Sequence, residues 1–232
     1  MMLDRAALDG LRLRLWRLRD SVRDRAFGTK HRRRVFGRIF ADNLWGDPGS
    51  PSGGGSSLPA TESVRVGLPA LLRRHGVQSL LDAPCGDFSW MQEVVPAVKQ
   101  YVGVDIVPDL IARNTALYRR AGVSFVCADI VADSLPAADL ILCRDCFIHL
   151  STRLIRKALL NFRSTGAPFL LLTHDVSASE YHDIAVGSFR PINFMKPPFS
   201  FPLPLDQITE GAEGRQLCLW DLQTLEIPTS DL

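Results

Sequence analysis

The stretch SLLDAPCGDFSW at residues 79–90 constrains the fold more than any other part of the chain. Its apolar run has no helical period and leads to Asp82, and a turn containing Pro84 and Gly86 follows. This pattern is typical of a buried parallel strand that enters a tight turn. Residues 88–95 are then expected to begin a helix. A strand, a turn and a helix N-terminus form the ligand-binding corner of an open α/β sheet, so we expect the chemistry there.

The residues of this turn distinguish two classes of cofactor. A dinucleotide pyrophosphate needs a Gly-x-Gly-x-x-Gly turn, which lets the backbone approach the phosphates. Here Gly86 stands alone in the turn, and Asp87 would repel a phosphate. S-adenosylmethionine has no phosphate and carries a cationic amino group and a sulfonium. The acidic side chains of Asp82 and Asp87 therefore suit S-adenosylmethionine better.

At these residues the sequence resembles the class I S-adenosylmethionine-dependent methyltransferases, whose first motif is an apolar strand, an acidic residue and a small-Gly-x-Gly turn. Residues 82–88 read DAPCGDF, with Pro84 and Phe88 where that family usually has glycine. The longer motif DAPCGDFxWM, preceded by Trp45-Gly46, by SPSGGGS at residues 50–56 and by a threonine, is similar to a group of bacterial methyltransferase-like proteins.

Residues 45–57 allow two interpretations. Their Gly, Ser and Pro content is that of a flexible linker. However, Trp45 would be costly to leave in a linker, and Thr61 is a candidate N-cap for a helix over the residues that follow. The resemblance covers residues 45–222 and implies that Trp45, Ser56 and Thr61 belong to the cofactor site.

Two further strands are predicted to end in carboxylates. Residues 100–105 end at Asp105, close to the spacing of about 20 residues at which an acid receives ribose hydroxyls. A strand over residues 123–128 leads to Asp129, which by resemblance accepts a hydrogen bond from the adenine amino group. The remaining cofactor-binding candidates implied by the resemblance are Asp82, Ala83, Pro84, Cys85, Gly86, Ile106, Ile130 and Arg144.

The candidate catalytic residues follow a fourth strand, predicted over residues 138–143. In the resembled family this strand end faces the transferable methyl group, and a histidine often occurs in the loop. His149 is the first candidate for a base, because an unperturbed pKa near 6.5 suits proton removal at neutral pH. A helix-capping or cofactor-contacting role for His149 is the alternative. Asp145 and His174 are the other catalytic candidates.

The cysteines favour neither a metal site nor a disulfide framework. Cys143, Cys146 and His149 have zinc-like spacing, but no second ligand cluster is apparent in the sequence. The cysteine count of 5 is odd and no secretory segment is recognisable, so we expect reduced thiols and a cytoplasmic location. No apolar run approaches the roughly 18 residues needed to span a bilayer, so no transmembrane segment is predicted.

The N-terminal part of the chain is basic: residues 1–40 contain 12 Lys and Arg against 4 Asp. Helices are predicted over residues 3–26 and 35–43. Apolar residues recur at helical spacing in the first helix, which favours a helix packed on its own acidic domain; contact with nucleic acid or anionic lipid is the alternative. These residues are Leu8, Leu11, Leu15, Leu18 and Val22. We expect an extension at residues 1–44 and a main domain at residues 45–232.

Strands and helices alternate from about residue 64 to 175, which predicts a doubly wound, mostly parallel α/β sheet. Helices are expected over residues 62–75, 108–121 and 152–163, and a fifth strand over residues 168–173. The proline-rich and aromatic residues 181–204 predict a packed loop, and residues 216–222 an antiparallel edge strand. The resemblance extends this to the seven-stranded sheet of class I methyltransferases.

The function implied by the resemblance is methyl transfer from S-adenosylmethionine to a small molecule or a glycan, at a hydroxyl oxygen. The alternative is a binding or regulatory protein that keeps the fold without catalysis. A nucleic acid acceptor is disfavoured, because the main domain is acidic and no Asn-Pro-Pro-Tyr type motif follows the fourth strand.

Overall fold

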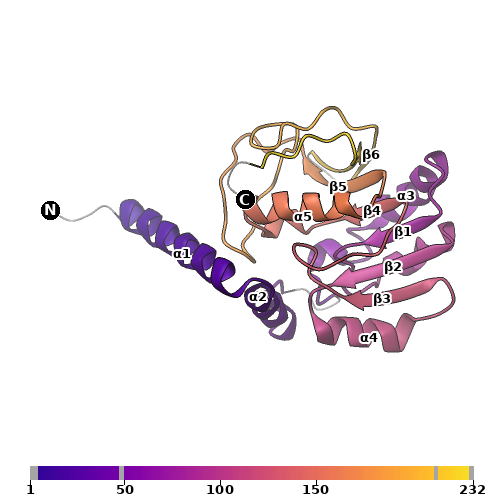
Figure 1. The fold of residues 1–232 in the computed structure, drawn as a ribbon, viewed down its shortest axis with the longest axis horizontal. Coiled ribbons are helices and arrows are strands. Elements are labelled where there is room, and N and C mark those ends of the chain that lie inside the picture. The colour runs from indigo at the N-terminus through magenta and orange to yellow at the C-terminus, as the bar shows by residue number, and fades with distance from the viewer. Residues whose placement is uncertain (1–4, 47–49, 212–213, 230–232) are drawn as a thin grey trace.

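A computed structural model describes residues 5–46, 50–211 and 214–229. Among these residues, seven strands form one sheet in the order β3-β2-β1-β4-β5-β7-β6 (Figure 1). The helices are α1 (Arg5–Phe27), α2 (Thr29–Ala41), α3 (Glu62–Arg74), α4 (Pro108–Tyr118) and α5 (Thr152–Ser164). The strands are β1 (Ser79–Asp82), β2 (Gln100–Asp105), β3 (Val123–Cys127), β4 (Leu140–Cys143), β5 (Phe169–Asp175), β6 (Asp206–Thr209) and β7 (Arg215–Asp221).

Strands β1 to β5 run parallel to one another, and β7 is antiparallel to both β5 and β6. Successive side chains of a strand point to opposite faces of the sheet. Leu80 of β1 therefore packs in the same cluster as α3, while its neighbour Leu81 packs in the cluster of α5. Because both faces are covered, the central strands are apolar throughout, and the predicted doubly wound sheet is confirmed.

The predicted helix over residues 88–95 is wrong. Phe88 has a φ of 61° and is fully buried against the rings of Tyr101, Tyr118 and Phe125. Only single 3₁₀ turns follow, at Met91–Glu93 and Val95–Ala97. A proline within the second turn lacks the N–H that would continue an α-helix. The ligand-binding corner is therefore a turn anchored by a buried ring, without a helix N-terminus.

The predicted edge strand is also misplaced. Strand β7 lies inside the sheet, between β5 and β6, and the edge is β6, which the sequence did not reveal. The four residues of β6 are too few to show an alternating pattern. Its place is determined by pairing with β7 and by Ile208, which packs against α3 close to Gly67.

The long segment between β5 and β6 is a packed loop, as predicted. Phe194, Phe199 and Phe201 are buried and contact one another, and Trp220 of β7 donates a hydrogen bond from Nε1 to the carbonyl oxygen of Pro202 at 2.9 Å. Arg190 is buried and donates from NH1 to the carbonyl oxygen of Leu150 at 2.7 Å. This loop therefore holds the segment after β4 in place.

Helix α1 projects away from the sheet, and α2 runs beside the body (Figure 1). The contacts of α1 with the body are polar: Arg17 donates to the carbonyl oxygen of Asp183 at 2.8 Å, and Asp20 accepts from the backbone N–H of Val186 at 2.9 Å. The expected packing of the apolar stripe on the body is wrong for its described part, because those side chains are more than half exposed. They are Leu15 (51%), Leu18 (61%) and Val22 (58%).

Helix α2 begins at Thr29, six residues before the predicted start. Its first turn is polar and basic, which hid it from a search for apolar periodicity. Within the described part of the chain, no helix combines the length and the apolar character needed to cross a membrane.

Candidate active site

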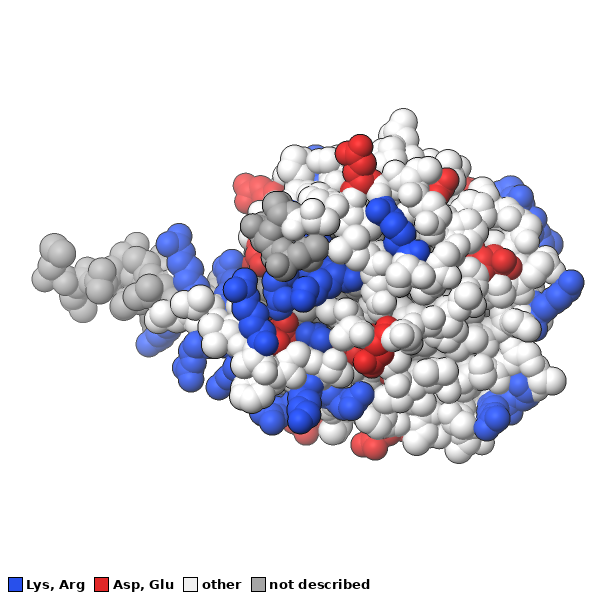
Figure 2. All heavy atoms as spheres, in the orientation of Figure 1, with Lys and Arg blue, Asp and Glu red and all other residues white. Residues whose placement is uncertain are grey.

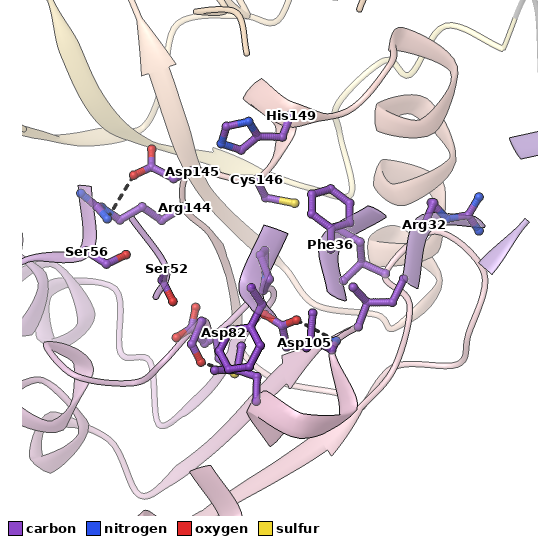
Figure 3. A pocket seen from close by; sticks show the side chains of 18 of the residues that line it. Arg32, Phe36, Ser52, Ser56, Asp82, Asp105, Arg144, Asp145, Cys146 and His149 are labelled. Carbon is purple, nitrogen blue, oxygen red and sulfur yellow. Dashed lines mark hydrogen bonds and ion pairs between the residues drawn. The ribbon is translucent and has the colours of Figure 1, made fainter. Parts of the chain in front are cut away.

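A pocket lies at the carboxyl ends of β1, β2, β3 and β4, where an open α/β sheet binds its ligands (Figure 3). Figure 3 shows Asp82 and Asp105 on one side of this pocket and Asp145 and His149 on the other. Most of the wall comes from four segments: α2, the Ser- and Gly-rich residues 50–56, the strand ends, and the loop after β4.

Asp82 and Asp105 are buried at the pocket wall with few partners. Asp82 accepts a hydrogen bond from the hydroxyl of Tyr101 at 2.7 Å, and Asp105 accepts from the backbone N–H of Val107 at 3.0 Å. Burial raises the pKa of Asp82 to about 7 and that of Asp105 to about 6. Removal from water disfavours a negative charge, so both groups are suited to receive a cation or hydroxyl donors.

Asp87 does not line the pocket, contrary to its expected role beside a cationic cofactor. Its carboxylate accepts hydrogen bonds from the hydroxyls of Ser50 (2.7 Å) and Ser89 (2.8 Å), and its backbone N–H donates to the hydroxyl of Ser52 at 2.9 Å. Asp87 therefore fastens the Ser- and Gly-rich segment to the turn after β1.

The described residues of this segment are docked on the body, so the linker interpretation is wrong for them. Ser50 is buried, and Ser52 and Ser56 line the pocket. A side chain at Gly86 would meet the hydroxyl of Ser52, since an added Cβ would lie only 2.7 Å from it. Glycine at this position therefore permits the close approach of the two segments. Residues 47–49 lie outside the described residues.

Asp129, expected to receive the adenine amino group, is bound by α2. Its Oδ2 accepts from Arg32 Nε at 2.9 Å and from the Thr29 hydroxyl at 2.8 Å, and its Oδ1 accepts from the backbone N–H of Val131 at 2.9 Å. Arg32 also pairs with Asp24 of α1. A cofactor would therefore share Asp129 with an existing ion pair.

Helix α2 contributes three residues that sequence reasoning missed. Arg32, Phe36 and Phe40 recur every four residues and face the pocket from one side of the helix. Figure 3 shows Arg32 and Phe36 across the pocket from Ser52 and Ser56. The spacing of four residues was the available signal, but the run Arg32-Arg33-Arg34 was interpreted only as a basic segment.

An ionic cluster of four side chains follows β4, and two of them, Arg144 and Asp145, line the pocket. Arg144 donates to both carboxylate oxygens of Glu210, from Nε at 2.9 Å and from NH2 at 3.1 Å. Arg215 pairs with Asp145 and with Glu210. The guanidinium of Arg144 also lies 5.5 Å from the centre of the Trp90 ring. Glu210 follows β6 and Arg215 begins β7; neither was predicted, because nothing in the chain order places this hairpin beside β4.

His149 has one ring nitrogen fixed and one available. Nδ1 lies 2.7 Å from the carbonyl oxygen of Ser188, and a carbonyl only accepts, so Nδ1 carries the proton. Burial lowers the pKa of His149 below its usual 6.5, which keeps the ring neutral near pH 7. Nε2 therefore holds a lone pair, and it has no hydrogen-bond partner among the described residues. The ring stacks on Trp45 with centroids 4.9 Å apart.

The structure brings most of the predicted site residues to the pocket. Those that line it are Trp45, Ser56, Asp82, Pro84, Cys85, Gly86, Asp105, Ile106, Asp129, Ile130, Arg144, Asp145 and His149. Thr61, Ala83 and His174 do not line it. Thr61 precedes α3 as expected, but its hydroxyl donates to the carbonyl oxygen of Ser57 at 2.9 Å instead of capping the helix.

His174 lies within β5 and is fully buried. Its Nδ1 accepts a hydrogen bond from the backbone N–H of Phe194 at 3.1 Å, and its ring meets the Trp220 ring edge-on at 5.8 Å. It therefore anchors the packed loop and is a poor candidate for catalysis. Among the described residues no cluster of His, Cys, Asp and Glu could hold a metal ion.

The family model described as a methyltransferase domain matches residues 80–168. The solved structures similar to this chain include the N-methyltransferase NodS from Bradyrhizobium japonicum WM9 in complex with S-adenosyl-L-homocysteine. The two chains are 18% identical with a TM-score of 0.60, and the match covers 81% of this chain and 98% of NodS. A comparison with curated proteins gives no match.

Two other similar structures are more distant in sequence. A SAM-dependent methyltransferase from Leishmania major is 13% identical with a TM-score of 0.62, over 80% of this chain and 83% of that one. Magnesium protoporphyrin IX methyltransferase from Synechocystis PCC 6803, with bound S-adenosylhomocysteine, is 13% identical with a TM-score of 0.54, over 81% and 96%. The family match assigns a methyltransferase domain to residues 80–168, and the fold is the Rossmann-like fold of class I methyltransferases.

Proposed function

We propose that the protein transfers a methyl group from S-adenosylmethionine to a hydroxyl oxygen of a small molecule, sugars included. The pocket's donors and acceptors fit this cofactor. Asp82 and Asp105 are buried carboxylates with no ion-pair partner among the described residues, and burial raises the pKa of both. Asp82 would receive the ammonium group of the methionine end, and Asp105 the ribose hydroxyls.

The walls of the pocket suit the uncharged parts of the cofactor. Ile106 and Ile130 follow the second and third strands and offer apolar surface beside Asp105. Phe36 and Phe40 of α2 cover the same side and exclude water from it. When bound, S-adenosylmethionine supplies a methyl carbon already activated by the positive sulfur, so the protein's main task is orientation.

The observation that carries the choice of a hydroxyl acceptor is the fixed tautomer of His149. Its Nδ1–H is held by the carbonyl oxygen of Ser188, so Nε2 is the basic atom, and His149 lines the pocket across from Asp82. His149 takes the hydroxyl proton at Nε2 while the oxygen bonds to the methyl carbon and the carbon–sulfur bond breaks. A neutral amine can attack the methyl carbon without a base, whereas a hydroxyl needs one. A basic histidine at this position therefore favours a hydroxyl acceptor.

Trp45 and the ionic cluster complete this side of the pocket. The Trp45 ring holds the imidazole by stacking and offers a flat apolar surface of the kind that packs against a sugar or an aromatic ring. Asp145 is paired with Arg144 and Arg215, so its carboxylate is oriented rather than free to move. We assign it to acceptor binding, with His149 as the base.

The test is transfer of a labelled methyl group from S-adenosylmethionine to a panel of hydroxylated and amine acceptors. With the best acceptor, His149→Ala should lower kcat by about 10²-fold, with cofactor affinity nearly unchanged. For the parent, kcat/KM should rise with pH to a plateau, with an apparent pKa below 6.5, because the neutral imidazole is the active form.

The matched control is His182→Ala, which removes an exposed histidine of the packed loop and should leave kcat unchanged. Methylation of amines alone, or full turnover by His149→Ala, would refute the hydroxyl mechanism. Loss of cofactor affinity in His149→Ala would instead assign the residue to binding.

A further inference from the structure

Helix α1 presents an apolar stripe to solvent on the side away from the body. Leu15, Leu18 and Val22 recur at three and four residues, so they lie on one face of the helix. Between 51% and 61% of each side chain is exposed. We define these three residues as the outer stripe. Leu8 and Leu11 would extend the outer stripe by the same spacing, but their side chains are not described.

The opposite face of α1 contacts the body through polar side chains in the C-terminal half of the helix, while Leu13 (46% exposed) and Trp16 (48% exposed) lie outside the outer stripe and face solvent. Asp24 pairs with Arg32 of α2 and with Arg153 of α5. The Oδ1 atom of Asp20 lies 2.7 Å from Nε2 of His31. This arrangement is the reverse of a helix that packs on its own domain, in which the apolar face would be buried. In the described structure the side chains of the outer stripe therefore face solvent and do not pack on the body.

Arginines flank the outer stripe on both sides. In helical projection Arg14 and Arg25 lie on one side of it, and Arg19 and Arg23 on the other, all exposed. Figure 2 shows Lys and Arg side chains gathered along α1 and at its junction with the body. The two described aspartates of α1 both face the body, so no described acidic group of this helix offsets the positive outer face.

We propose that α1 docks the protein on an anionic lipid surface, with the outer stripe at the level of the acyl chains and the flanking arginines on the headgroups. An apolar stripe between rows of cationic side chains is the pattern of an interfacial helix. Each arginine near an anionic bilayer adds to binding, by roughly fivefold per charge. Nucleic acid would neutralise the arginines but leave the outer stripe in water. A second copy would place rows of arginine beside one another, where like charges repel.

Flotation of the full chain with vesicles tests this proposal. The parent should float with vesicles that contain phosphatidylcholine and phosphatidylglycerol, and remain unbound with phosphatidylcholine alone. Raising the salt concentration from about 0.1 M to about 0.5 M should weaken binding severalfold, because the Debye length shortens. A parent that ignores the anionic vesicles at low salt would overturn the proposal.

Three variants separate the two parts of the surface from general loss of apolar residues. Leu15→Ser with Leu18→Ser and Val22→Ser should weaken vesicle binding at least tenfold, and Arg19→Gln with Arg23→Gln by about tenfold. Val66→Ser is the matched control, because Val66 is 75% exposed on α3, and it should float like the parent.

Far-ultraviolet circular dichroism and S-adenosylhomocysteine binding check that each variant is folded, since no variant alters a pocket residue. Equal flotation of the parent and the stripe variant would overturn lipid docking. A parent dimer that the stripe variant abolishes, without vesicle binding, would assign the outer stripe to self-association and likewise overturn it. Both results are independent of the methyl acceptor, so they leave the proposed activity intact.

Discussion

Two groups of buried or partly buried carboxylates lie in or beside the pocket, and their surroundings differ. Glu210 and Asp145 face arginines at close range, and Asp129 is held by Arg32. Asp82 and Asp105 have a tyrosine hydroxyl and backbone N–H groups as their hydrogen-bond partners instead. Burial raises the pKa of Asp82 to about 7 and that of Asp105 to about 6.

This difference separates structural charges from charges that await a ligand. A carboxylate paired with a guanidinium holds two elements together, and removing one partner leaves the other charge buried and unpaired. A carboxylate buried without a cation makes folding less favourable when it ionises, and that cost is recovered when a cation binds. The first group should therefore mainly govern stability, although Asp145 is also assigned to acceptor binding, and the second group should govern cofactor binding.

The largest expected effect is on the paired group. Glu210→Ala leaves the guanidiniums of Arg144 and Arg215 with one carboxylate between them, so the free energy of unfolding should fall by about 3–5 kcal/mol. Urea denaturation at pH 7 measures this. The control is Glu62→Ala at an exposed site on α3, for which a change below about 0.5 kcal/mol is expected. A loss for Glu210→Ala no larger than for this control would end the distinction between the two groups.

The second effect has the opposite sign. The folded pKa of Asp82 lies above its unfolded value of 3.8, so this group's contribution to stability is largest at low pH and is lost as pH rises to about 7. Asp82→Asn keeps an acceptor for the hydroxyl of Tyr101 without the charge. The variant should therefore exceed the parent in stability by about 2 kcal/mol at pH 8, with the difference shrinking towards pH 5.

Urea denaturation of both proteins at four pH values between 5 and 8 gives this comparison. The same variant should bind S-adenosylhomocysteine more weakly, since the ligand's ammonium loses its carboxylate. A variant less stable than the parent at every pH would place Asp82 with the structural charges.

The smallest effect concerns the Ser- and Gly-rich segment. Ser50 and Ser52 already hold it to Asp87, so we expect a modest further tightening when ligand fills the pocket. Amide exchange over residues 50–56 should slow by about threefold or more on addition of S-adenosylhomocysteine, while α3 stays unchanged. Equal exchange with and without bound ligand would show that this segment is a static wall of the pocket that does not tighten on the ligand.

The sequence predicted those elements that can be recognised from the local pattern of apolar and acidic residues. Strand β2 was placed at its observed bounds, because its apolar run ends in a single acid, and the carboxylates of Asp82 and Asp105 meet at one edge by the geometry of parallel strands. His149 was found because it follows β4 directly. These inferences depend on neighbours along the chain.

The parts that were missed depend on distant partners. Glu210 reaches Arg144 only because the unpredicted β6 pairs with β7, and Arg32 reaches Asp129 only because α2 folds back over the strand ends. The exposed face of α1 is the clearest case. Periodicity located its apolar stripe, but no pattern within the helix could show whether that stripe faces the body or the solvent.

Calorimetric titration with S-adenosylhomocysteine tests most directly the central claim that the strand-end carboxylates bind the cofactor. The parent should bind, Asp105→Ala should lose about 1–3 kcal/mol of binding free energy through lost charge-assisted hydrogen bonds, and the exposed Asp109→Ala should match the parent. No binding by the parent, or equal affinity of the parent and Asp105→Ala, would contradict the account.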